Sequence, residues 1–600
     1  MVAIVIAEIF PMWDTLIRPV REHLPLWLML LPVFSAVVAG FARQVGAEAV
    51  RRTMLVNLLL SAALSVWLVA AYEPLKPVSS QEQAARLGPL ERFQFRDSFA
   101  WVGESRDVLV EQINRRGERG IAKVTAQWGP DIRFAVGVDG ISVWFVALSV
   151  LLVVVGSGVC ESLRPNADGR MPMAVASTPS VAWLWLQASL VGTFVALDVV
   201  LFVMCWMSTL LAVAWLAGRG GDSQRHNVLP RLLKASWLGG WLVALGLGGL
   251  VLAVGWLQPP PTPSEATLIF SIPELASGIR LWTVAGGNAY LWGTINIWLF
   301  WLLVVGFTWP LGLAPLHRGF VDAFASAPRG VALVLAGVLL KVGVYGWLRF
   351  IVPVFPDLLS QHAASFTTLV GLSSLFAAVL AFGERDWHRR IALATSSSVG
   401  LSLIGVMTLT LEGMTGGLLR VLSHGLTAGL LVWLLPREGV ESLFQAISSD
   451  DRCFADEFGG LKKTPDPVTL RRRWLVRFAL FAWIGLPGLS GFVAEFVTPF
   501  GLFQHEFNAA ALSLISSGLI AWMWVRADRE PLDWSRDLWT RRDTLVAATL
   551  VALNIALGVA PQFVVNRLQP SLVLLLPVDR TTSQRDAAAE LKQASQSEVR

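Results

Sequence analysis

Long apolar runs recur along almost the whole chain, and they set the strongest limit on what it can fold into. Each run holds about the 20 residues that an α-helix needs to cross the hydrocarbon core of a bilayer. Backbone polar groups find no partner in lipid, so such segments cross it as helices. We therefore predict an all-α polytopic membrane protein with about 14 spans. The predicted spans are residues 24–42, 53–72, 141–160, 175–195, 197–217, 232–257, 292–310, 330–352, 364–383, 391–411, 415–435, 475–499, 508–526 and 543–566.

The composition supports this class and excludes several others. Hydrophobic residues make up 54% of the chain and charged residues only 15%, the opposite of a soluble domain. The three cysteines, Cys160, Cys205 and Cys453, lie far apart and indicate neither a disulfide framework nor a metal site. The sequence contains no nucleotide-binding glycine loop, flavin or iron–sulfur signature, or nucleophile triad. We expect no cofactor in this chain and no nucleic-acid partner, and we place any redox step on other subunits.

Arginine and lysine cluster in alternate loops between the predicted spans. The odd-numbered loops are rich in them and most even-numbered loops are nearly free of them, so the odd loops should be cytoplasmic and both termini extracytoplasmic. The second loop, residues 73–133, carries many charges of both signs, but loops of that length cross the membrane largely regardless of charge. We expect the bacterial inner membrane as the location. The apolar start "MVAIVIAEIFPMWD" predicts an interfacial helix, and the polar end "SQRDAAAELKQASQSEVR" predicts a tail.

Charged or titratable side chains fall inside three of the later spans. A charge at the bilayer centre costs at least about 2.5 to 3.5 kcal/mol, so such residues usually face the interior of the bundle and mark an ion path. Lys341 lies in "LVLAGVLLKVGVYG", Glu495 in "GLPGLSGFVAEF", and His424 in "LLRVLSHGLTAGLL". Arg420 precedes His424 by one helical turn, which puts both on one face of the helix. The alternative is that these side chains only tie helices together.

Two aspartates stand at predicted span ends. Asp139 lies in "VGVDGIS" and Asp198 in "ALDVVLF". At such positions a carboxylate usually caps a helix or pairs two helices. We favour that role and keep proton transfer through Asp139 or Asp198 as the alternative.

Two spans are interrupted by helix breakers. Span 7 contains Pro310, Gly312 and Pro315, and span 12 contains Gly485 and Pro487; proline removes a helix hydrogen bond and clashes with the preceding turn. Broken helices at matching places in two halves indicate inverted repeats with an ion path at the break. We predict repeats at spans 4–8 and 9–13. The resulting units are residues 1–133 with the long loop, 134–353 with span 3 and the first repeat, 354–527 with the second repeat, and 528–600 with the last span and the tail.

Together these stretches resemble a known family, the antiporter-like proton-translocating subunits of respiratory complex I, and within it the M type. The resemblance covers about residues 134–500. It rests on "RFAVGVDGISVWFVALSVLL", "FVALDVVLFV", "APLHRGFVDAFASAP", "LAGVLLKVGVYGWLRFIVPVFPD", "RDWHRRIALATSSSVG", "LSHGL" and "GLPGLSGFVAEF".

The resemblance implies roles for several residues. Lys341 would be the central lysine of a buried proton path, Glu495 its end in span 12, and His424 the histidine of span 11. His317 and Asp322 would be the histidine and aspartate of the loop after span 7. Flavin, iron–sulfur clusters and quinone would then belong to partner subunits in the same membrane complex.

The chain also departs from this family pattern. Met207 stands where a glutamate is usual in span 5, and Trp309 or Pro310 where a lysine is usual in span 7. Both halves of the family's first charge pair are therefore absent, which puts its usual route for protons in question. Further differences are Ser398 and Phe324 at two histidine positions and Arg420 at a glutamine position.

Three functions remain open at this stage. The first is a proton-translocating M-type subunit of NADH-quinone oxidoreductase or a close relative. The second is an antiporter-like membrane partner in inorganic-carbon uptake or in cation/proton antiport, which the missing charge pair favours. The third is a structural subunit that conducts nothing.

Overall fold

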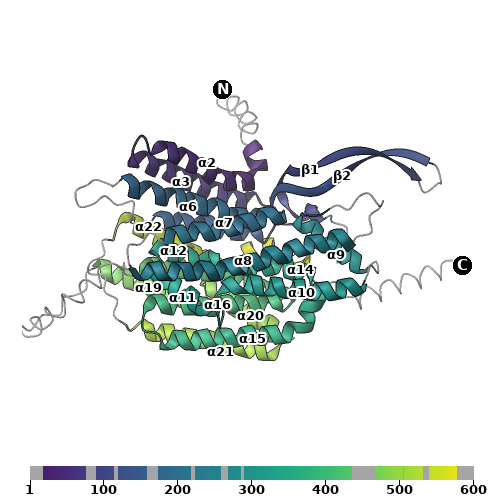
Figure 1. Cartoon of the computed structure of the whole chain (residues 1–600). Helices are drawn as coiled ribbons and strands as arrows, with labels where there is room; N and C mark the ends of the chain where they lie inside the picture. The colour runs from purple at the N-terminus through teal and green to yellow at the C-terminus, as the bar shows by residue number, and fades with distance from the viewer. Residues whose placement is uncertain are drawn as a thin grey trace, which may run out of the picture.

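The computed structural model describes most of the chain (Figure 1). The predicted N-terminal interfacial helix, the C-terminal tail, Cys160 and Cys453 lie outside the described residues. These are 18–75, 89–113, 119–158, 173–217, 223–257, 268–284, 289–435, 467–503, 506–530 and 539–576.

The membrane-spanning character of the chain is confirmed. Within the described residues, 11 helical segments are long and apolar enough to cross a membrane, and three shorter apolar helices add to them. Every predicted span has a counterpart among these. The long ones are α2 (Leu24–Ala42), α3 (Ala47–Ala71), α7 (Val199–Ala217), α8 (Ser223–Leu257), α10 (Ala289–Thr308), α15 (Pro356–Gly383), α16 (Trp387–Met407), α17 (Leu411–Leu434), α21 (Phe507–Ala527), α22 (Arg541–Val559) and a composite span, Arg329–Val354. The shorter ones fall in α5 (Ser142–Gly158), α6 (Met173–Val195) and α20 (Ser490–Phe503).

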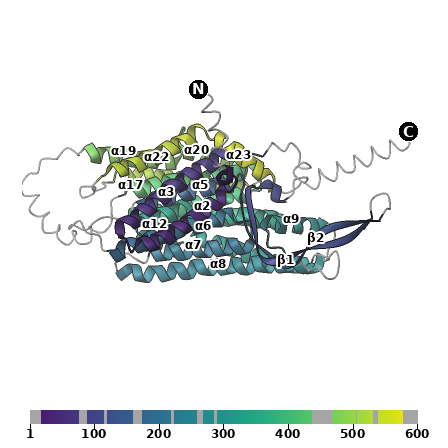
Figure 2. The ribbon, with the colours of Figure 1, turned by 90° about the horizontal axis from the view of Figure 1, so that it is seen from above.

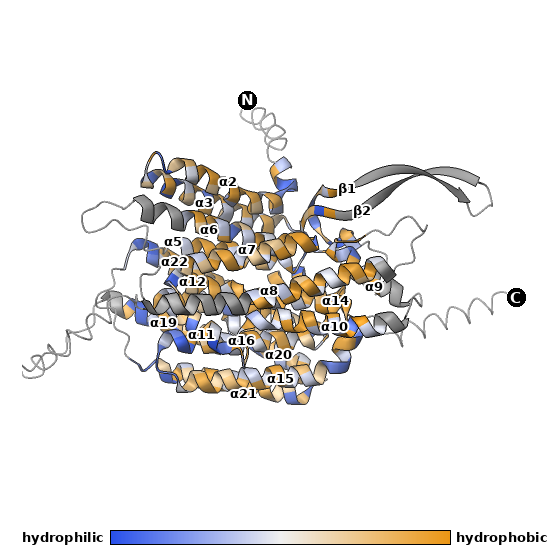
Figure 3. Ribbon diagram, in the orientation of Figure 1, coloured by the Kyte–Doolittle hydropathy of each residue, from blue (hydrophilic) through white to orange (hydrophobic). Residues whose placement is uncertain are grey.

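The helices lie side by side with roughly parallel axes, and they form a centre and a shell (Figures 1 and 2). α16, α17 and the composite span are buried almost along their whole length, whereas α2, α3 and α22 are mostly exposed. Most large exposed side chains of these outer helices are apolar, for example Phe34 and Leu59, and hydrophobic residues predominate along the helices (Figure 3). Lys341, His424 and Arg420 all belong to the buried centre.

The composite span contains the first feature that the sequence did not predict. It starts as α12 (Arg329–Val334), widens into a π-helical turn at Leu335–Leu339, continues as α13 (Lys341–Gly346), widens again at Trp347–Ile351 (η5), and ends as α14 (Val352–Val354). Such turns break the regular backbone ladder and occur often at functional positions. Here the first one leaves the carbonyl of Ala336 to accept a hydrogen bond from the Lys341 amine.

Both predicted helix breaks are present. α10 runs into a single 3₁₀ turn at Trp309–Leu311 and the chain reverses at Gly312, whose φ is 66°. In span 12, α19 (Pro467–Ile484) is separated from α20 by Gly485 and Gly488, each with φ of 85°, a conformation that glycine adopts without strain. The division into two inverted repeats stays a prediction.

One connection between spans contains a helix that the sequence analysis did not predict. The segment after span 7, which was expected to be a loop with His317 and Asp322, is the ten-residue helix α11 (His317–Ser326). Its pattern is strongly amphipathic, so one face packs against α8 and α16 while the polar face stays outside.

The long second loop is also more ordered than predicted. It contains a short 3₁₀ turn, η1 (Pro89–Arg92), and an antiparallel hairpin of β1 (Gln94–Ile113) and β2 (Arg119–Val138) that extends from the helix bundle (Figures 1 and 2). Near the bundle, Phe134 packs against Phe99 and Trp101 across the two strands. Aromatic pairs of this kind stabilise a hairpin. The many charged residues of both signs in this loop hid the strand pattern in the sequence.

The orientation predicted from the arginines can be tested with cysteine labelling. In a background with its native cysteines replaced by serine, Phe99→Cys on the hairpin should react with a membrane-impermeant maleimide in intact spheroplasts. Arg385→Cys, in the exposed connection between α15 and α16, should react only after permeabilisation. Labelling of Arg385→Cys but not of Phe99→Cys in intact spheroplasts would reverse the predicted topology.

Candidate functional site

Lys341 and His424 form a direct contact in the centre of the bundle. The amine nitrogen Nζ of Lys341 lies 3.0 Å from Nδ1 of His424, and both side chains are buried, with 1% and 4% of their surface exposed. When the Lys341 amine donates, His424 accepts through Nδ1 and carries its own hydrogen on Nε2. That Nε2 has no hydrogen-bond partner among the described residues, and the ring packs edge-on against Trp483 at the end of α19, with centroids 4.7 Å apart.

Close approach of two backbones makes this contact possible. A Cβ atom built on Gly425, next to His424, would lie 2.8 Å from the carbonyl oxygen of Gly337 in the composite span. Small residues let membrane helices approach in this way. Glycine at both positions therefore places α17 near enough to Lys341 for a hydrogen bond.

Arg420 and Glu495 form an ion pair one helical turn away from His424. The guanidinium of Arg420 on α17 donates through Nη2 to Oε2 of Glu495 on α20. Ser517 on α21 donates to the same carboxylate oxygen over 2.7 Å. Arg420 is fully inside the bundle, whereas the Glu495 side chain keeps 24% of its surface exposed, so the pair connects the interior with the outer side of α20.

The four central residues predicted from the sequence thus lie in one group. Lys341 contacts His424, His424 shares a face of α17 with Arg420, and Arg420 pairs with Glu495. We call these four residues the polar cluster. The contact between Arg420 and Glu495 was not predicted, because sequence spacing cannot show which helix faces Arg420.

His317 and Asp322 lie apart from the polar cluster on α11. His317 packs edge-on against Phe376 on α15. Burial, together with the neighbouring Arg318, holds the pKa of His317 below its ordinary value of 6.5, so the ring is neutral at pH 7. Asp322 pairs with Arg389 over 2.9 Å, with both side chains partly exposed. Among the described residues, no hydrogen bond or ion pair joins either side chain to Lys341.

Asp198 has the capping geometry that we favoured. Its Oδ1 accepts from the backbone N–H of Val200 at 2.8 Å and of Leu201 at 3.3 Å, in the first turn of α7. Its Oδ2 accepts from the backbone N–H of Arg133 on β2. The carboxylate therefore joins the hairpin to the start of α7.

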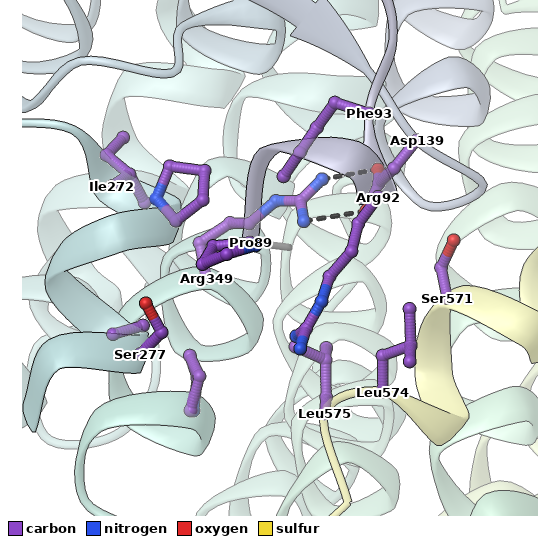
Figure 4. A pocket seen from close by; sticks show the side chains of 13 residues that line it. Pro89, Arg92, Phe93, Asp139, Ile272, Ser277, Arg349, Ser571, Leu574 and Leu575 are labelled. Carbon is purple, nitrogen blue, oxygen red and sulfur yellow. Dashed lines mark hydrogen bonds and ion pairs between the residues drawn. The ribbon is translucent and has the colours of Figure 1, made fainter. Parts of the chain in front are cut away.

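Arg349 is a buried charge that the sequence analysis missed. It forms a two-pronged ion pair with Asp139, with Nη1 and Oδ2 2.7 Å apart (Figure 4). Asp139 also caps α5, because its Oδ1 accepts from the N–H groups of Ile141 and Ser142. The sequence did contain a signal for Arg349. Lys341, Tyr345 and Arg349 are spaced by four residues, which puts Arg349 on the same helical face as Lys341.

A small cavity of about 80 Å³ lies beside this ion pair (Figure 4). Its polar lining comes from Arg92, Asp139, Arg349, Ser277 and Ser571, and its remaining walls are apolar. α23 (Gln562–Val573) closes one side. There the N–H of Gly140 donates to Ser571 over 3.0 Å.

The space between α7, α10 and the composite span is filled with aromatic rings. Trp206 on α7 stacks on Phe307 of α10 with centroids 5.5 Å apart, and Phe307 stacks on Phe350 of the composite span at the same separation. Phe202 packs on Phe350 at 5.0 Å. The described side chains of α7, α8 and α10 include no Asp, Glu, His or Lys. This region is therefore apolar, in contrast to the polar cluster.

Comparison with known proteins agrees with this architecture. A family model described as NADH:quinone oxidoreductase/Mrp antiporter, transmembrane, matches residues 196–520, which is more than half of the chain. The chain belongs to this family. It is similar to subunit M of NADH-quinone oxidoreductase from Rhodobacter capsulatus, with 29% identity over 467 residues, covering 75% of this chain and 83% of that protein.

Solved structures of the family share the fold. A chain of respiratory complex I from Thermus thermophilus with bound NADH aligns with a TM-score of 0.63 and 20% identity, covering 92% of this chain and 100% of that one. A chain of the Mrp complex from Dietzia sp. DQ12-45-1b aligns with a TM-score of 0.63 and 14% identity, covering 94% and 98%. The resemblance to M-type subunits read from the sequence is thus confirmed.

The Asp139–Arg349 pair generates a prediction about stability. Arg349→Met should destabilise the protein by about 3 to 5 kcal/mol, because it leaves the buried Asp139 carboxylate without its charged partner. The double variant with Asp139→Asn should lose less than Arg349→Met alone. Thermal unfolding of the purified chain in detergent measures both. As a control, Arg389→Met removes a partly exposed pair and should cost under about 1 kcal/mol; an equal loss in the two single variants would contradict a special role for the buried pair.

Proposed function

We propose that this chain is a proton-translocating membrane subunit of an NADH:quinone oxidoreductase or of a close relative. Quinone reduction on partner subunits would be coupled to proton transfer along Lys341, His424 and Glu495. The observation that carries the proposal is the buried contact between Lys341 and His424. It is supported by membership of the family and by the similarity to M-type subunits.

The contact has the chemistry of a relay. A lysine amine and an imidazole can exchange one proton along a single hydrogen bond, and an imidazole that accepts on one nitrogen can release from the other. In the low dielectric of the bundle, the charged state of such a pair responds strongly to nearby charges. The second nitrogen of His424 has no partner among the described residues, and it is the nitrogen from which onward transfer toward Glu495 would start.

The path runs through the second half of the bundle. The aromatic filling between α7, α10 and the composite span offers no group that takes up a proton. On the other side, the glycine break of span 12 brings Glu495 toward α17. Its partly exposed carboxylate is the end of the polar cluster that can exchange protons with the outside.

The setting of the subunit follows from the same reasoning. We place it in a bacterial inner membrane with both termini on the extracytoplasmic side, as the distribution of arginines indicates. Its partners would be further membrane subunits together with subunits that carry flavin, iron–sulfur clusters and quinone. No redox group is assigned to this chain.

Replacement of Lys341 by methionine tests the proton path. In inverted membrane vesicles that contain the assembled complex, Lys341→Met should reduce NADH-driven proton uptake by at least about tenfold, because an apolar side chain of similar length cannot carry a proton. His424→Phe should act similarly. Arg477→Gln, which removes the ion pair between α19 and Asp528, is the matched control and should pump normally.

Two outcomes would reject the proposal. If Lys341→Met pumps like the unaltered chain, Lys341 is not on the path. If deletion of the chain prevents assembly while Lys341→Met and His424→Phe change nothing, the chain is a structural subunit.

The identity of the partners is tested by affinity purification of the tagged chain from its native membrane in mild detergent. We expect mass spectrometry to recover quinone-reductase membrane subunits together with flavin and iron–sulfur subunits. Recovery of one soluble zinc protein without any redox subunit would instead favour the inorganic-carbon reading. Recovery of antiporter subunits alone would favour cation/proton antiport.

A further inference from the structure

We propose that the Arg420–Glu495 ion pair is the charge switch of this subunit. When the proton of the Lys341–His424 pair passes to Glu495, the charge of Arg420 loses its counter-ion and opposes reloading of that pair. Release of the proton from Glu495 to the outside restores the counter-ion and lets the pair load again. This inference rests on the proposed function. It assigns to Arg420 the role of a fixed positive charge beside the relay.

The geometry places the switch directly beside the relay. Arg420 and His424 lie four residues apart on α17, so their side chains are neighbours on one face. His424 contacts Lys341 at 3.0 Å, and Arg420 contacts Glu495. A change of charge at Glu495 therefore acts on Arg420 by contact, and Arg420 acts through space on the neighbouring His424 and its partner Lys341.

Charge counting shows why the two ends must be coupled. A guanidinium stays protonated at any ordinary pH, so Arg420 is a fixed positive charge, with only 3% of its side chain exposed. Within the polar cluster Glu495 is the single carboxylate. When it is ionised, a protonated relay leaves one net positive charge in the cluster; when it is protonated, the same relay leaves two. Two uncompensated charges in a buried site repel strongly.

Glu495 is suited to be the side that exchanges protons. Its carboxylate is the most exposed member of the pair, and Ser517 holds it in place with a hydrogen bond of 2.7 Å. Ser517 has no charge, so it orients the carboxylate in either state. Arg420, which stays charged, lies inside the bundle, and Glu495, which can change its charge, lies nearer the surface. Glu495 can therefore exchange protons with the outside while the charge of Arg420 stays beside the relay.

Other charged groups on the elements packed against α17 are engaged elsewhere. α12, α16, α19, α22 and α23 contact α17 and carry charged side chains, whereas α5 carries none. The engaged groups among them are Arg329 at the Val432 carbonyl and over Trp433, Arg390 with Glu530, Arg472 over Trp539, Arg477 with Asp528, Arg567 over Phe563, and Asp543 in the cap of α22. The polar cluster is thus affected mainly by its own members.

Opposite pH shifts in two single variants test the switch. NADH-driven proton uptake is measured in inverted vesicles between about pH 5.5 and 9. On the alkaline side of this pH profile the rate falls because the Lys341–His424 pair no longer takes up a proton, and the pH of this alkaline limb is compared between each variant and the unaltered chain. Glu495→Gln leaves Arg420 unpaired, so the relay loads only at lower pH. Arg420→Gln leaves the carboxylate unpaired, so the relay stays loaded to higher pH. We expect each limb to move by about one pH unit, which is a tenfold change in proton affinity.

The double variant and the controls separate a switch from a structural tie. Arg420→Gln with Glu495→Gln should return the limb to its original position while uptake stays slow. Arg477→Gln should not move the limb at all. Where Glu495→Gln stops uptake, Glu495→Asp keeps a longer, weaker pair and should shift the limb in the same direction by less.

The outcomes distinguish this inference from the proposed function. If Lys341→Met has no effect on uptake, the proposed function fails and the switch with it. If Lys341→Met stops uptake but the limbs of the Arg420→Gln and Glu495→Gln variants stay in place or move in the same direction, only the switch is overturned. Limbs that move in opposite directions support it.

Discussion

The arrangement of this protein depends on the cost of burying the Lys341 amine. A charge at this depth is tolerated only with partners, and the structure provides two, the Ala336 carbonyl and the His424 ring. Each of these two contacts depends on a local feature of the helix backbone. A π-helical turn presents the carbonyl, and the glycine contact between Gly337 and Gly425 admits the ring. The remaining helices form the apolar shell that keeps these contacts dry and therefore strong.

Two regions of the bundle are packed in opposite ways, the space between α7, α10 and the composite span and the space around the polar cluster. In the first, stacked rings of Trp206, Phe307 and Phe350 fill the space by dispersion and exclude titratable groups. In the second, Arg420 and Glu495 keep a buried charge pair next to the relay. Of these two regions, the buried charges that contact each other directly therefore lie on the side of α17 and α20.

A second buried ion pair holds the far end of the composite span. Arg349 and Asp139 join that span to the start of α5, and Tyr345 between Lys341 and Arg349 donates to the Phe194 carbonyl over 2.9 Å. The helical face that carries Lys341 is therefore fixed at several points. This rigidity holds Lys341 within hydrogen-bond distance of His424.

The sequence by itself determined the membrane class, the spans, both helix breaks and the members of the polar cluster, because hydropathy, glycine and proline, and the cost of buried charge act locally along the chain. It did not reveal the β-hairpin, helix α11 or the π-helical turns, where tertiary packing decides the backbone. Above all, only the tertiary structure decided the pairing: Arg349 with Asp139, and Arg420 with Glu495. These partners are 210 and 75 residues apart, and nothing in local spacing specifies which helices become neighbours.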